Sequence, residues 1–453
     1  MKPLNTMNRI LEALRRMRPS AIFAIALLLR MAWIVTLEDK LVWPDEQEFG
    51  AIAEQLAAGN GYVSNSYRAN PVVPVYLAAF FKLFGLELLA PRIGQAILGA
   101  ATCVLLARLT ATLAGPVAGT LAGLMLAIYP AHIYLSGVFY VACIATFLST
   151  LGIWLVVRVP DSTHPLGTAV TAGVVLGLTA LTRATFLAYL PLAPIAIVWA
   201  ARSSWRSMIA PSAALFAVSL AVVVPWSVRN SLLYERPMLI SSGLWETLWK
   251  GNNELSNGGP DDRNMVWQNY VWNERVEQLE PGYRAEIESR YEAINADMRA
   301  AYARSGDMFL ARDETLRPVV IGLIAEDPAR IARLFGIKVL TLFDAFSDTE
   351  KSNETTTSAK KLVAALSFYP ILAFALVGFV MVVGQHRRYG AVVLYVASFV
   401  FVYGALTACT RFRLPVDPFL MLFAAVALER LAEQPARRAS WQRSRRLSAA
   451  AGS

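Results

Sequence analysis

Two adjacent carboxylates, Asp45 and Glu46, follow the first long apolar stretch of the chain by only a few residues. A carboxylate at the point where a chain leaves an apolar phase can take the proton of a hydroxyl group, which is general-base chemistry. The same segment also suits the start of a helix, with Asp45 as the N-cap and Glu48 three residues later. Capping explains Asp45 but not the neighbouring acids. We therefore predict that Asp45 and Glu46 form a catalytic pair.

Arginines recur in the segments that the expected topology puts on the same side as this pair. A guanidinium group donates two parallel hydrogen bonds and keeps its charge at any working pH, so it suits a phosphate or pyrophosphate. Arginines at a membrane surface also anchor helices to lipid headgroups, and both interpretations stay open. The candidate phosphate ligands are Arg68, Arg183, Arg229, Arg411 and Arg413. Further candidates for substrate contact are Tyr62, His132, Asn230 and Asn252, although packing is the simpler role for His132.

The composition is that of an integral membrane protein. Of the 453 residues, 56% are hydrophobic and 17% are charged, which is too little polar surface to cover one soluble globule. Apolar runs of about 20 residues indicate spanning helices rather than the short alternating segments of a membrane barrel. The net charge of +9 follows the positive-inside rule better than it suggests nucleic-acid binding. The 3 Cys and 3 His have no metal-ligand spacing.

About ten spanning helices follow from the apolar runs and from the distribution of basic residues. We expect them at 20–37, 91–113, 117–135, 139–157, 166–181, 184–201, 207–226, 362–383, 390–408 and 415–431. The fold class is thus an all-α polytopic membrane protein, a bundle of about ten or eleven transmembrane helices with external juxtamembrane helices and a small external loop domain. Arg30 lies inside the first span, where an unpaired charge costs at least about 2.5 kcal/mol, so we expect a glutamate or a phosphate as its partner.

The expected organisation has five parts. A basic cytoplasmic N-terminus, an N-terminal transmembrane module, an external segment, the C-terminal transmembrane helices and a basic tail are expected at 1–19, 20–226, 227–361, 362–431 and 432–453, with the first external loop at 38–90. The external segment contains a loop at 251–262, rich in Gly, Asn and Pro. The stretch 317–347 is expected to be interfacial or re-entrant, because basic residues interrupt its apolar pattern.

One helix of the external segment carries an apolar face that recurs every three or four residues. Its members are Tyr283, Ile287, Tyr291, Ile294, Met298 and Tyr302. An aromatic platform for a sugar is one interpretation, and packing on the membrane domain is the favoured one.

Several motifs resemble, in the same order, those of the GT-C superfamily of glycosyltransferases that use polyprenyl-phosphate-linked sugars. They are Asp45-Glu46 with the residues up to Arg92, and the segments 177–183, 225–230, 251–253 and 411–415. The resemblance covers about residues 20–430. It extends to the bacterial branch, with protein O-mannosyltransferases and the aminoarabinose transferase that modifies lipid A.

The resemblance implies an inverting transfer, with Asp45 as the base, Glu46 as its acidic neighbour and the arginines as ligands of the lipid-linked phosphate. The implied partners are a polyprenyl-phosphate-linked sugar donor, an acceptor hydroxyl on a lipid, glycan or protein, and membrane lipids, with no nucleic acid. No cofactor is implied, although nearby acids including Asp39 and Glu48 could hold a divalent cation. Where many relatives carry a second acid, this chain has Val141-Ala142, so the Asp45-Glu46 pair must supply the carboxylates.

Location and alternatives follow from composition and topology. The excess of Arg over Lys and the high Ala content are typical of bacteria, which predicts the inner membrane with the site facing the periplasm. A flippase or transporter for polyprenyl-linked lipids is an alternative, and it should show broken helices or repeated halves. A non-catalytic membrane protein that binds glycans is another. Asp45→Asn separates both from an enzyme, because asparagine caps a helix about as well as aspartate.

Overall fold

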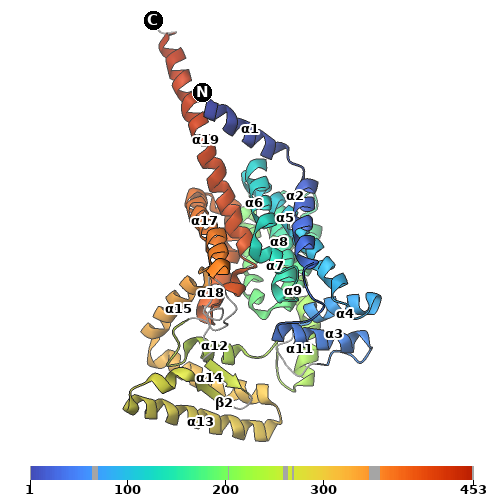
Figure 1. The fold of residues 1–453 in the computed structure, drawn as a ribbon, viewed down its shortest axis with the longest axis vertical. Helices are drawn as coiled ribbons and strands as arrows, with labels where there is room; N and C mark the ends of the chain where they lie inside the picture. Colours follow the sequence, from blue (N-terminus) through green and yellow to red (C-terminus); the bar gives the residue numbers. More distant parts are fainter. Residues whose placement is uncertain are drawn as a thin grey trace.

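The computed structural model describes residues 2–63, 70–201, 204–258, 264–267, 270–345 and 358–450. Nearly all regular structure in these ranges is helical, in agreement with the predicted all-α membrane fold. Both termini lie at one end of the molecule, where α1 and the last turns of α19 project (Figure 1). The opposite end, formed by α3, α4 and α12 to α15, is called the loop end below.

The elements follow one another along the chain with short connections. The first half contains α1 (Lys2–Arg16), α2 (Pro19–Ile34), α3 (Pro44–Ala57), α4 (Val72–Phe84), α5 (Leu89–Ala114), α6 (Pro116–Ile128), α7 (Pro130–Tyr134), α8 (Val141–Arg158), η1 (Val159–Asp161), α9 (Pro165–Thr182), η2 (Ala184–Tyr189), α10 (Leu192–Ala200), η3 (Trp205–Met208) and α11 (Ile209–Leu233). The second half contains α12 (Leu244–Asn252), β1 (Asn264–Trp267), β2 (Tyr270–Asn273), η4 (Glu274–Gln278), α13 (Pro281–Ser305), α14 (Met308–Glu326), α15 (Pro328–Leu342), α17 (Ser358–Val382), η5 (Val383–Gln385), α18 (His386–Ala405), η6 (Thr410–Arg413) and α19 (Asp417–Ala450).

The expected spans do not all correspond to single uninterrupted helices. Five helical stretches among the described residues are long and apolar enough to cross a membrane, at 89–114, 141–161, 165–182, 205–233 and 358–405, and the last of these holds both α17 and α18. A sixth results if α1 and α2, which are bent by 87°, are counted together. The expected spans at 117–135 and 184–201 are each broken near a proline, Pro130 and Pro191, because proline has no N–H to continue the helical ladder.

Glycine allows neighbouring spans to approach closely. A Cβ at Gly173 of α9 would lie 2.6 Å from the Leu215 carbonyl oxygen of α11, and one at Gly177 would lie 2.8 Å from that of Ser219. Lipid chains are as apolar as leucine, so close packing of small residues is what holds membrane helices together. These two positions explain why α9 and α11 pair along their length.

The first loop forms a small apolar layer at the loop end. Helices α3 and α4 bury Phe49, Ile52, Leu77 and Phe81 against each other and against the start of α5. Helix α3 has Pro44 in its first turn and Trp43 as its N-cap, so the expectation that Asp45 is the N-cap is wrong. The first loop thus contains two short helices, where the sequence predicts juxtamembrane helices.

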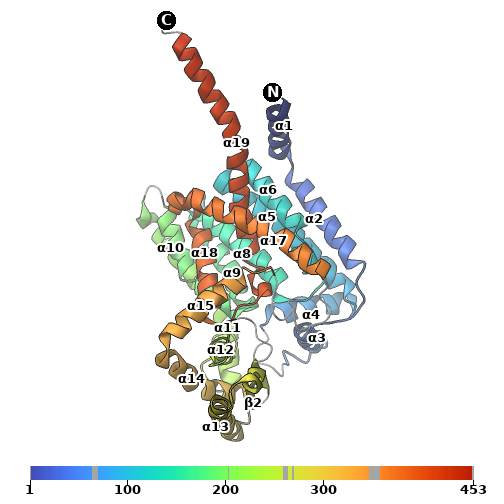
Figure 2. The ribbon, with the colours of Figure 1, turned by 60° about the vertical axis from the view of Figure 1, so that its left-hand side comes forward.

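The segment from α12 to α15, residues 244–342, forms a loop-end domain with its own core. Ile287, Tyr291, Ile294 and Met298 of α13 are buried against α14, β2 and Trp249. Figure 2 shows α13 at the far edge of the loop end, away from the membrane helices. The expectation that this face packs on the membrane domain is therefore wrong, and its outer members Tyr283 and Tyr302 are exposed.

Two further expectations concern the same domain. Residues 317–342 are the end of α14 and all of α15, which meet at Asp327, and neither helix is among the candidate spans; positions 346–347 of the expected stretch lie outside the described residues. In the expected loop at 251–262, Gly251 and Asn252 still belong to α12, and positions 259–262 lie outside the described residues.

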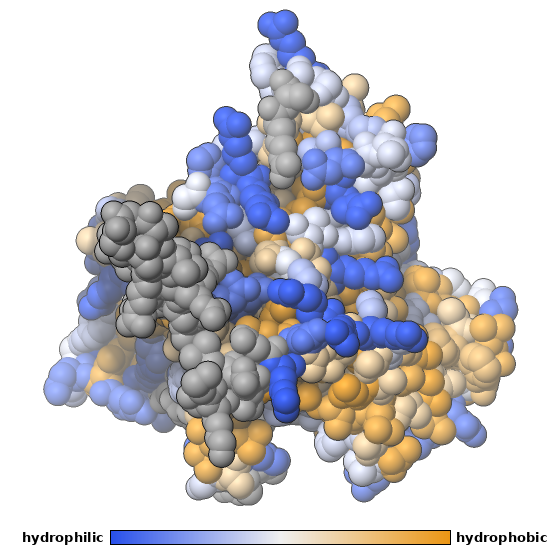
Figure 3. All heavy atoms as spheres, turned by 90° about the horizontal axis from the view of Figure 1, so that it is seen from above, coloured by the Kyte–Doolittle hydropathy of each residue, from blue (hydrophilic) through white to orange (hydrophobic). Residues whose placement is uncertain are grey.

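The end that carries the termini is rich in polar side chains. Figure 3 looks onto this end and shows hydrophilic residues over its middle and hydrophobic residues toward one side. Arg388 donates to the Thr112 carbonyl of α5 at 3.2 Å, and Arg430 donates to the Met381 carbonyl of α17 at 2.8 Å. Basic side chains thus bind helix ends at the end of the molecule that carries the termini.

Candidate active site

At the loop end, Asp45 lies near Tyr140, and Tyr140 in turn contacts the predicted phosphate ligand Arg411. Asp45 lies half-buried in the first turn of α3. Burial raises the pKa of the nearby Tyr140 hydroxyl; Arg411 and Arg183 lower it, and Asp45 raises it by its charge and as a hydrogen-bonding partner. The Arg411 guanidinium lies 5.2 Å from the centroid of the Tyr140 ring. Tyr140 therefore joins the predicted base to a predicted phosphate ligand from the other end of the chain.

Arg183 lies on the same aromatic surface as Arg411. Its guanidinium is 4.1 Å from the Phe412 ring centroid and 5.4 Å from that of Tyr403, and Arg411 is 5.5 Å from Phe412. The rings of Tyr403 and Phe412 stack at 5.1 Å. Cation–π contacts of this kind fix two guanidinium groups beside each other, and each guanidinium carries several N–H donors. The structure thus brings Asp45, Arg183 and Arg411 into one cluster.

Glu46 has a different environment from Asp45. Its carboxylate is 2% exposed and accepts backbone hydrogen bonds from Phe139 at 2.8 Å, Trp43 at 3.0 Å and Val42 at 3.2 Å. A buried carboxylate with three N–H donors is fixed in place. Glu46 therefore ties the start of α3 to the segment before α8, and this bond holds Asp45 next to Tyr140.

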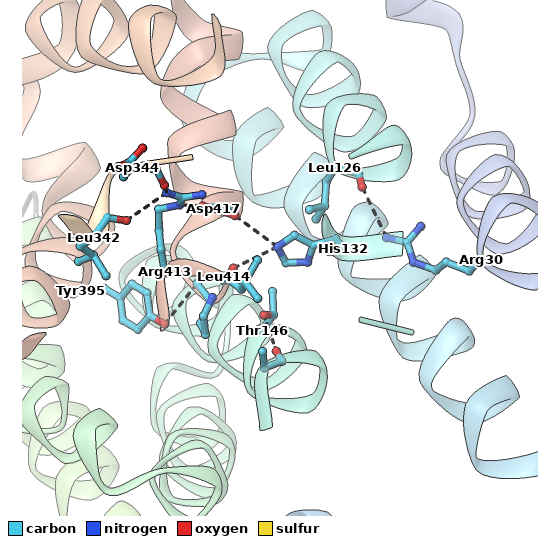
Figure 4. A network of polar contacts seen from close by, with 12 residues as sticks. Arg30, Leu126, His132, Thr146, Leu342, Asp344, Tyr395, Arg413, Leu414 and Asp417 are labelled. Carbon is cyan, nitrogen blue, oxygen red and sulfur yellow. Dashed lines mark hydrogen bonds and ion pairs between the residues drawn. The ribbon is translucent and has the colours of Figure 1, made fainter. Parts of the chain in front are cut away.

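Arg413 and His132 belong to a buried polar network rather than to the Asp45 cluster. Figure 4 shows Arg413 of η6 and His132 of α7 reaching toward Asp417 of α19. Arg413 Nε donates to Asp417 Oδ1 at 2.8 Å, and its Nη1 donates to the carbonyls of Leu342 at 3.0 Å and Asp344 at 2.6 Å. His132 Nε2 is 3.1 Å from the Leu414 carbonyl oxygen. The packing interpretation of His132 fits this environment, and Arg413 binds the end of α15 to α19.

Arg229 holds the segment that follows α3 against α11. Its Nη2 donates to the Tyr62 carbonyl at 2.9 Å and its Nη1 to Asn230 Oδ1 at 2.8 Å. The guanidinium also lies 5.1 Å from the Tyr62 ring and 4.7 Å from the Trp226 ring. Asn230 in turn donates to the Ile240 carbonyl at 2.8 Å. Three of the predicted residues, Tyr62, Arg229 and Asn230, are thus brought together, with backbone groups among their partners.

Asn252 is paired with Lys338, which the sequence analysis did not list as a site residue. Lys338 Nζ donates to Asn252 Oδ1 at 2.7 Å and to the Ala405 carbonyl at 3.1 Å. Burial, and after it the charge of Arg330, lowers the pKa of Lys338 to about 7. The contact connects α12 and α15 to the end of α18, a few residues before Arg411. A lysine on an otherwise apolar helix face was the signal for it in the sequence.

Arg30 has partners other than the acid or phosphate that was expected. Its Nη1 donates to the carbonyls of Ala26 at 3.0 Å and Ala127 at 3.3 Å, and its Nη2 donates to that of Leu126 at 3.5 Å. Pro130 has no N–H, so the Leu126 carbonyl lacks its helical donor where α6 ends. Arg30 occupies this break, and backbone oxygens replace the acidic partner.

The remaining candidates lie apart from the cluster or outside the description. Arg68 lies outside the described residues. Asp39 Oδ1 accepts a hydrogen bond from the Leu88 amide at 2.9 Å. Burial, and after it the charge of Glu48, raises the pKa of the Tyr62 hydroxyl. Within the described ranges, no group of three or more His, Cys, Asp or Glu side chains is arranged to hold a metal ion.

Comparison with known proteins gives one family match. Residues 68–228 match the model of a family described as dolichyl-phosphate-mannose-protein mannosyltransferase. No curated protein matches the chain.

The fold is shared with solved membrane proteins. The archaeal oligosaccharyltransferase AglB from Archaeoglobus fulgidus, in complex with an inhibitory peptide and a dolichol-phosphate, superposes with a TM-score of 0.53 at 13% identity, over 94% of this chain and 52% of that one. Its apo form gives 0.56 at 13% identity, over 95% and 52%. ArnT from Cupriavidus metallidurans bound to undecaprenyl phosphate gives 0.43 at 15% identity, over 91% and 78%.

The chain spans about half the length of the oligosaccharyltransferases it resembles. The helical membrane fold that they share extends over nearly all of the present chain. This likeness shows a fold shared with those oligosaccharyltransferases, and the match at 68–228 lies within it.

Proposed function

We propose that the protein transfers a sugar from a polyprenyl-phosphate-linked donor to the hydroxyl of an acceptor, with inversion at the anomeric carbon and with Asp45 as the base. The observation that carries the proposal is the meeting of Asp45, Arg411 and Arg183 around Tyr140 and Phe412. One carboxylate and two guanidinium groups are the parts that such a reaction needs. The description of the matched family, which names dolichyl-phosphate-mannose, supports the class of donor.

The chemistry assigns a role to each part of the cluster. The Asp45 carboxylate takes the proton of the acceptor hydroxyl, and the oxygen forms a bond to the anomeric carbon as the bond to the phosphate oxygen breaks. The leaving polyprenyl phosphate gains negative charge in this step. Arg411 and Arg183 stabilise that charge through charge-assisted hydrogen bonds. Glu46 keeps Asp45 in position and does not need to exchange a proton.

The position of the cluster supports a site on the external face of the membrane. It lies at the loop end, opposite the end that carries both termini and the basic residues Arg388 and Arg430. If the latter end faces the cytoplasm, as the positive-inside rule requires, the site opens outward. In a bacterial cell this is the periplasm.

Broken helices are a feature of transporters, and α6 and α7 form one such break. In transporters the ends of a break bind the substrate or the coupling ion. Here Arg30 donates to the carbonyls of Leu126 and Ala127 at the break. The contact favours a structural break, so transfer remains the function that the geometry supports best.

Asp45→Asn in purified protein, reconstituted in vesicles, tests the proposal. The assay follows release of polyprenyl phosphate from labelled polyprenyl-phosphate mannose and from donors with other sugars. A base contributes typically 10²–10⁴-fold, so we expect a loss of at least about 100-fold. Glu54→Gln is the matched control, because Glu54 is an exposed acid on the same helix. Full transfer by the Asn variant, or no transfer by the wild-type protein from any donor of the panel, contradicts the proposal.

A further inference from the structure

We propose that Tyr140 is a positioning residue of the transfer site, with a hydroxyl that orients the Asp45 carboxylate and a ring that seats the Arg411 guanidinium. The inference rests on the proposed function and adds a residue that neither the motifs nor the comparisons single out. It assigns separate tasks to two parts of one side chain. The two tasks can be removed one at a time.

The backbone around Tyr140 fixes where its side chain begins. Tyr140 is the N-cap of α8 and has extended backbone angles, with φ −101 and ψ 152. The preceding amide, that of Phe139, donates to Glu46 Oε1 at 2.8 Å. Since Glu46 follows Asp45 directly, this one bond fixes the start of α8 beside the start of α3. The same bond therefore brings Tyr140 close to Asp45.

The side chain of Tyr140 is held on a second side by the C-terminal part of the chain. It packs partly buried against Leu135, Ala142, Cys143 and Leu414. Arg411 lies 5.2 Å from its ring centroid, and Leu414 follows three residues later. The electron-rich face of an aromatic ring attracts a guanidinium group, so the ring sets the position of Arg411 without adding a charge.

The hydroxyl of Tyr140 interacts with the Asp45 carboxylate. A phenol can donate to one carboxylate oxygen and leave the other oxygen for an incoming hydroxyl group. Tyr140 can do so throughout the neutral range, because burial raises its pKa and keeps the phenol protonated. A neutral donor at this position orients the base without neutralising it.

The charged groups around Tyr140 come from three elements. Asp45 comes from α3, Arg411 from η6 and Arg183 from the end of α9. The other acids at the start of α3 have different partners. Glu46 accepts hydrogen bonds from backbone amides, and the charge of Glu48 interacts with the Tyr62 hydroxyl. A change in kcat after removal of the hydroxyl therefore reports on Asp45 in the field of these two arginines.

Two substitutions separate the hydroxyl from the ring. In Tyr140→Phe the ring remains, so the donor KM should stay within about twofold, while kcat falls about tenfold because the carboxylate loses the hydroxyl that orients it. In Tyr140→Leu the ring is also lost, and we expect the donor KM to rise by about a further tenfold. Tyr283→Phe is the control, since Tyr283 is 45% exposed on α13.

The outcomes distinguish this inference from the proposed function. An unchanged kcat in Tyr140→Phe, or a donor KM that is equal in the Phe and Leu variants, overturns the role of Tyr140 even if Asp45→Asn is inactive. Full transfer by Asp45→Asn overturns the proposed function instead. Thermal unfolding followed by tryptophan fluorescence shows that each variant is folded, and the conservative Phe variant carries the decision if the Leu variant does not fold.

Discussion

The Glu46 carboxylate accepts a hydrogen bond from the Phe139 amide at 2.8 Å, across two segments that are far apart in the sequence. The residue before Glu46 is Asp45, and the residue after Phe139 is Tyr140. The Glu46 side chain therefore sets the distance between Asp45 and Tyr140. Under the proposed function, Asp45 is the acid that does chemistry and Glu46 is the acid that fixes its position.

Replacement of Glu46 should loosen the site and reduce its activity together. Glutamine cannot replace both carboxylate oxygens, because its NH2 group would face the amides of Val42 and Trp43 or that of Phe139. Leaving a buried donor unpaired costs about 1–3 kcal/mol, so Glu46→Gln should lower the unfolding temperature and reduce transfer by at least about tenfold. Hydrogen exchange at the Phe139 amide should become faster. Unchanged exchange together with lost transfer would mean that Glu46 acts on the substrate directly.

The two arginines of η6 should respond in opposite ways to the same substitution. Arg411→Gln should reduce transfer by about 100-fold through a weaker hold on the phosphate, with little change in the unfolding temperature. Arg413→Gln leaves Asp417 buried without its ion-pair partner, which costs about 3–5 kcal/mol of stability. The double variant Arg413→Gln/Asp417→Asn removes both charges and should recover part of that loss. No recovery would show that the Leu342 and Asp344 carbonyls need Arg413 more than Asp417 does.

The stability of the contact between the loop-end domain and α18 should depend on pH through Lys338. Burial lowers the pKa of Lys338 from 10.5 to about 7, so between these values the unfolded chain binds a proton that the folded chain does not. The free energy of unfolding therefore rises with pH across this window and is level below it. A neutral amine still has two N–H groups, which match the two acceptors on Asn252 and Ala405.

Lys338→Met should remove this pH dependence. The measurement is the unfolding temperature of wild type and variant at about pH 7 and about pH 10, the ends of the window that the shifted and ordinary pKa values define. Lys82→Met, at an exposed position of α4, is the control and should keep the wild-type slope. A slope that survives in Lys338→Met would assign it to another group.

The break between α6 and α7 offers a double-mutant test of Arg30. Arg30→Leu should destabilise the bundle, because the Leu126 carbonyl loses its donor in an apolar environment. Pro130→Ala supplies a backbone N–H at the position where the helix lacks one. We therefore expect the cost of Arg30→Leu to be smaller in the Pro130→Ala background, with a coupling of about 1 kcal/mol in thermal or denaturant unfolding. Additive effects would exclude a shared carbonyl.

Composition and apolar periodicity were sufficient to predict a helical membrane protein, and the order of the motifs agrees with the family match at 68–228. Both depend on properties that are local in the chain, namely run length and residue type. The helix breaks at Pro130 and Pro191 were also visible as prolines. The apolar runs continue through both positions, so hydropathy alone joined the halves into single spans.

The candidate site was predicted in part. Asp45, Arg183 and Arg411 meet, whereas Arg229 and Arg413 bind other parts of the protein, and one arginine is indistinguishable from another before its neighbours are known. The face of α13 was assigned to the membrane domain because no local pattern of residues indicated that α12, α14 and β2 cover it. Tyr140 was missed for a similar reason. It stands next to Val141-Ala142, where only an acid was sought.

The contact between Arg30 and the end of α6 also has a consequence for biosynthesis. The two partners, Arg30 and Ala127, are 97 residues apart, so α2 leaves the ribosome well before its acceptors exist. Until α6 arrives, the guanidinium of α2 has the Ala26 carbonyl of its own helix but not those of Leu126 and Ala127, so water, lipid phosphates or the insertion machinery take their place, which favours a shallow position of its outer end. We expect α2 to reach its final depth only when α6 has been inserted, so the first span of the chain would be among the later ones to settle.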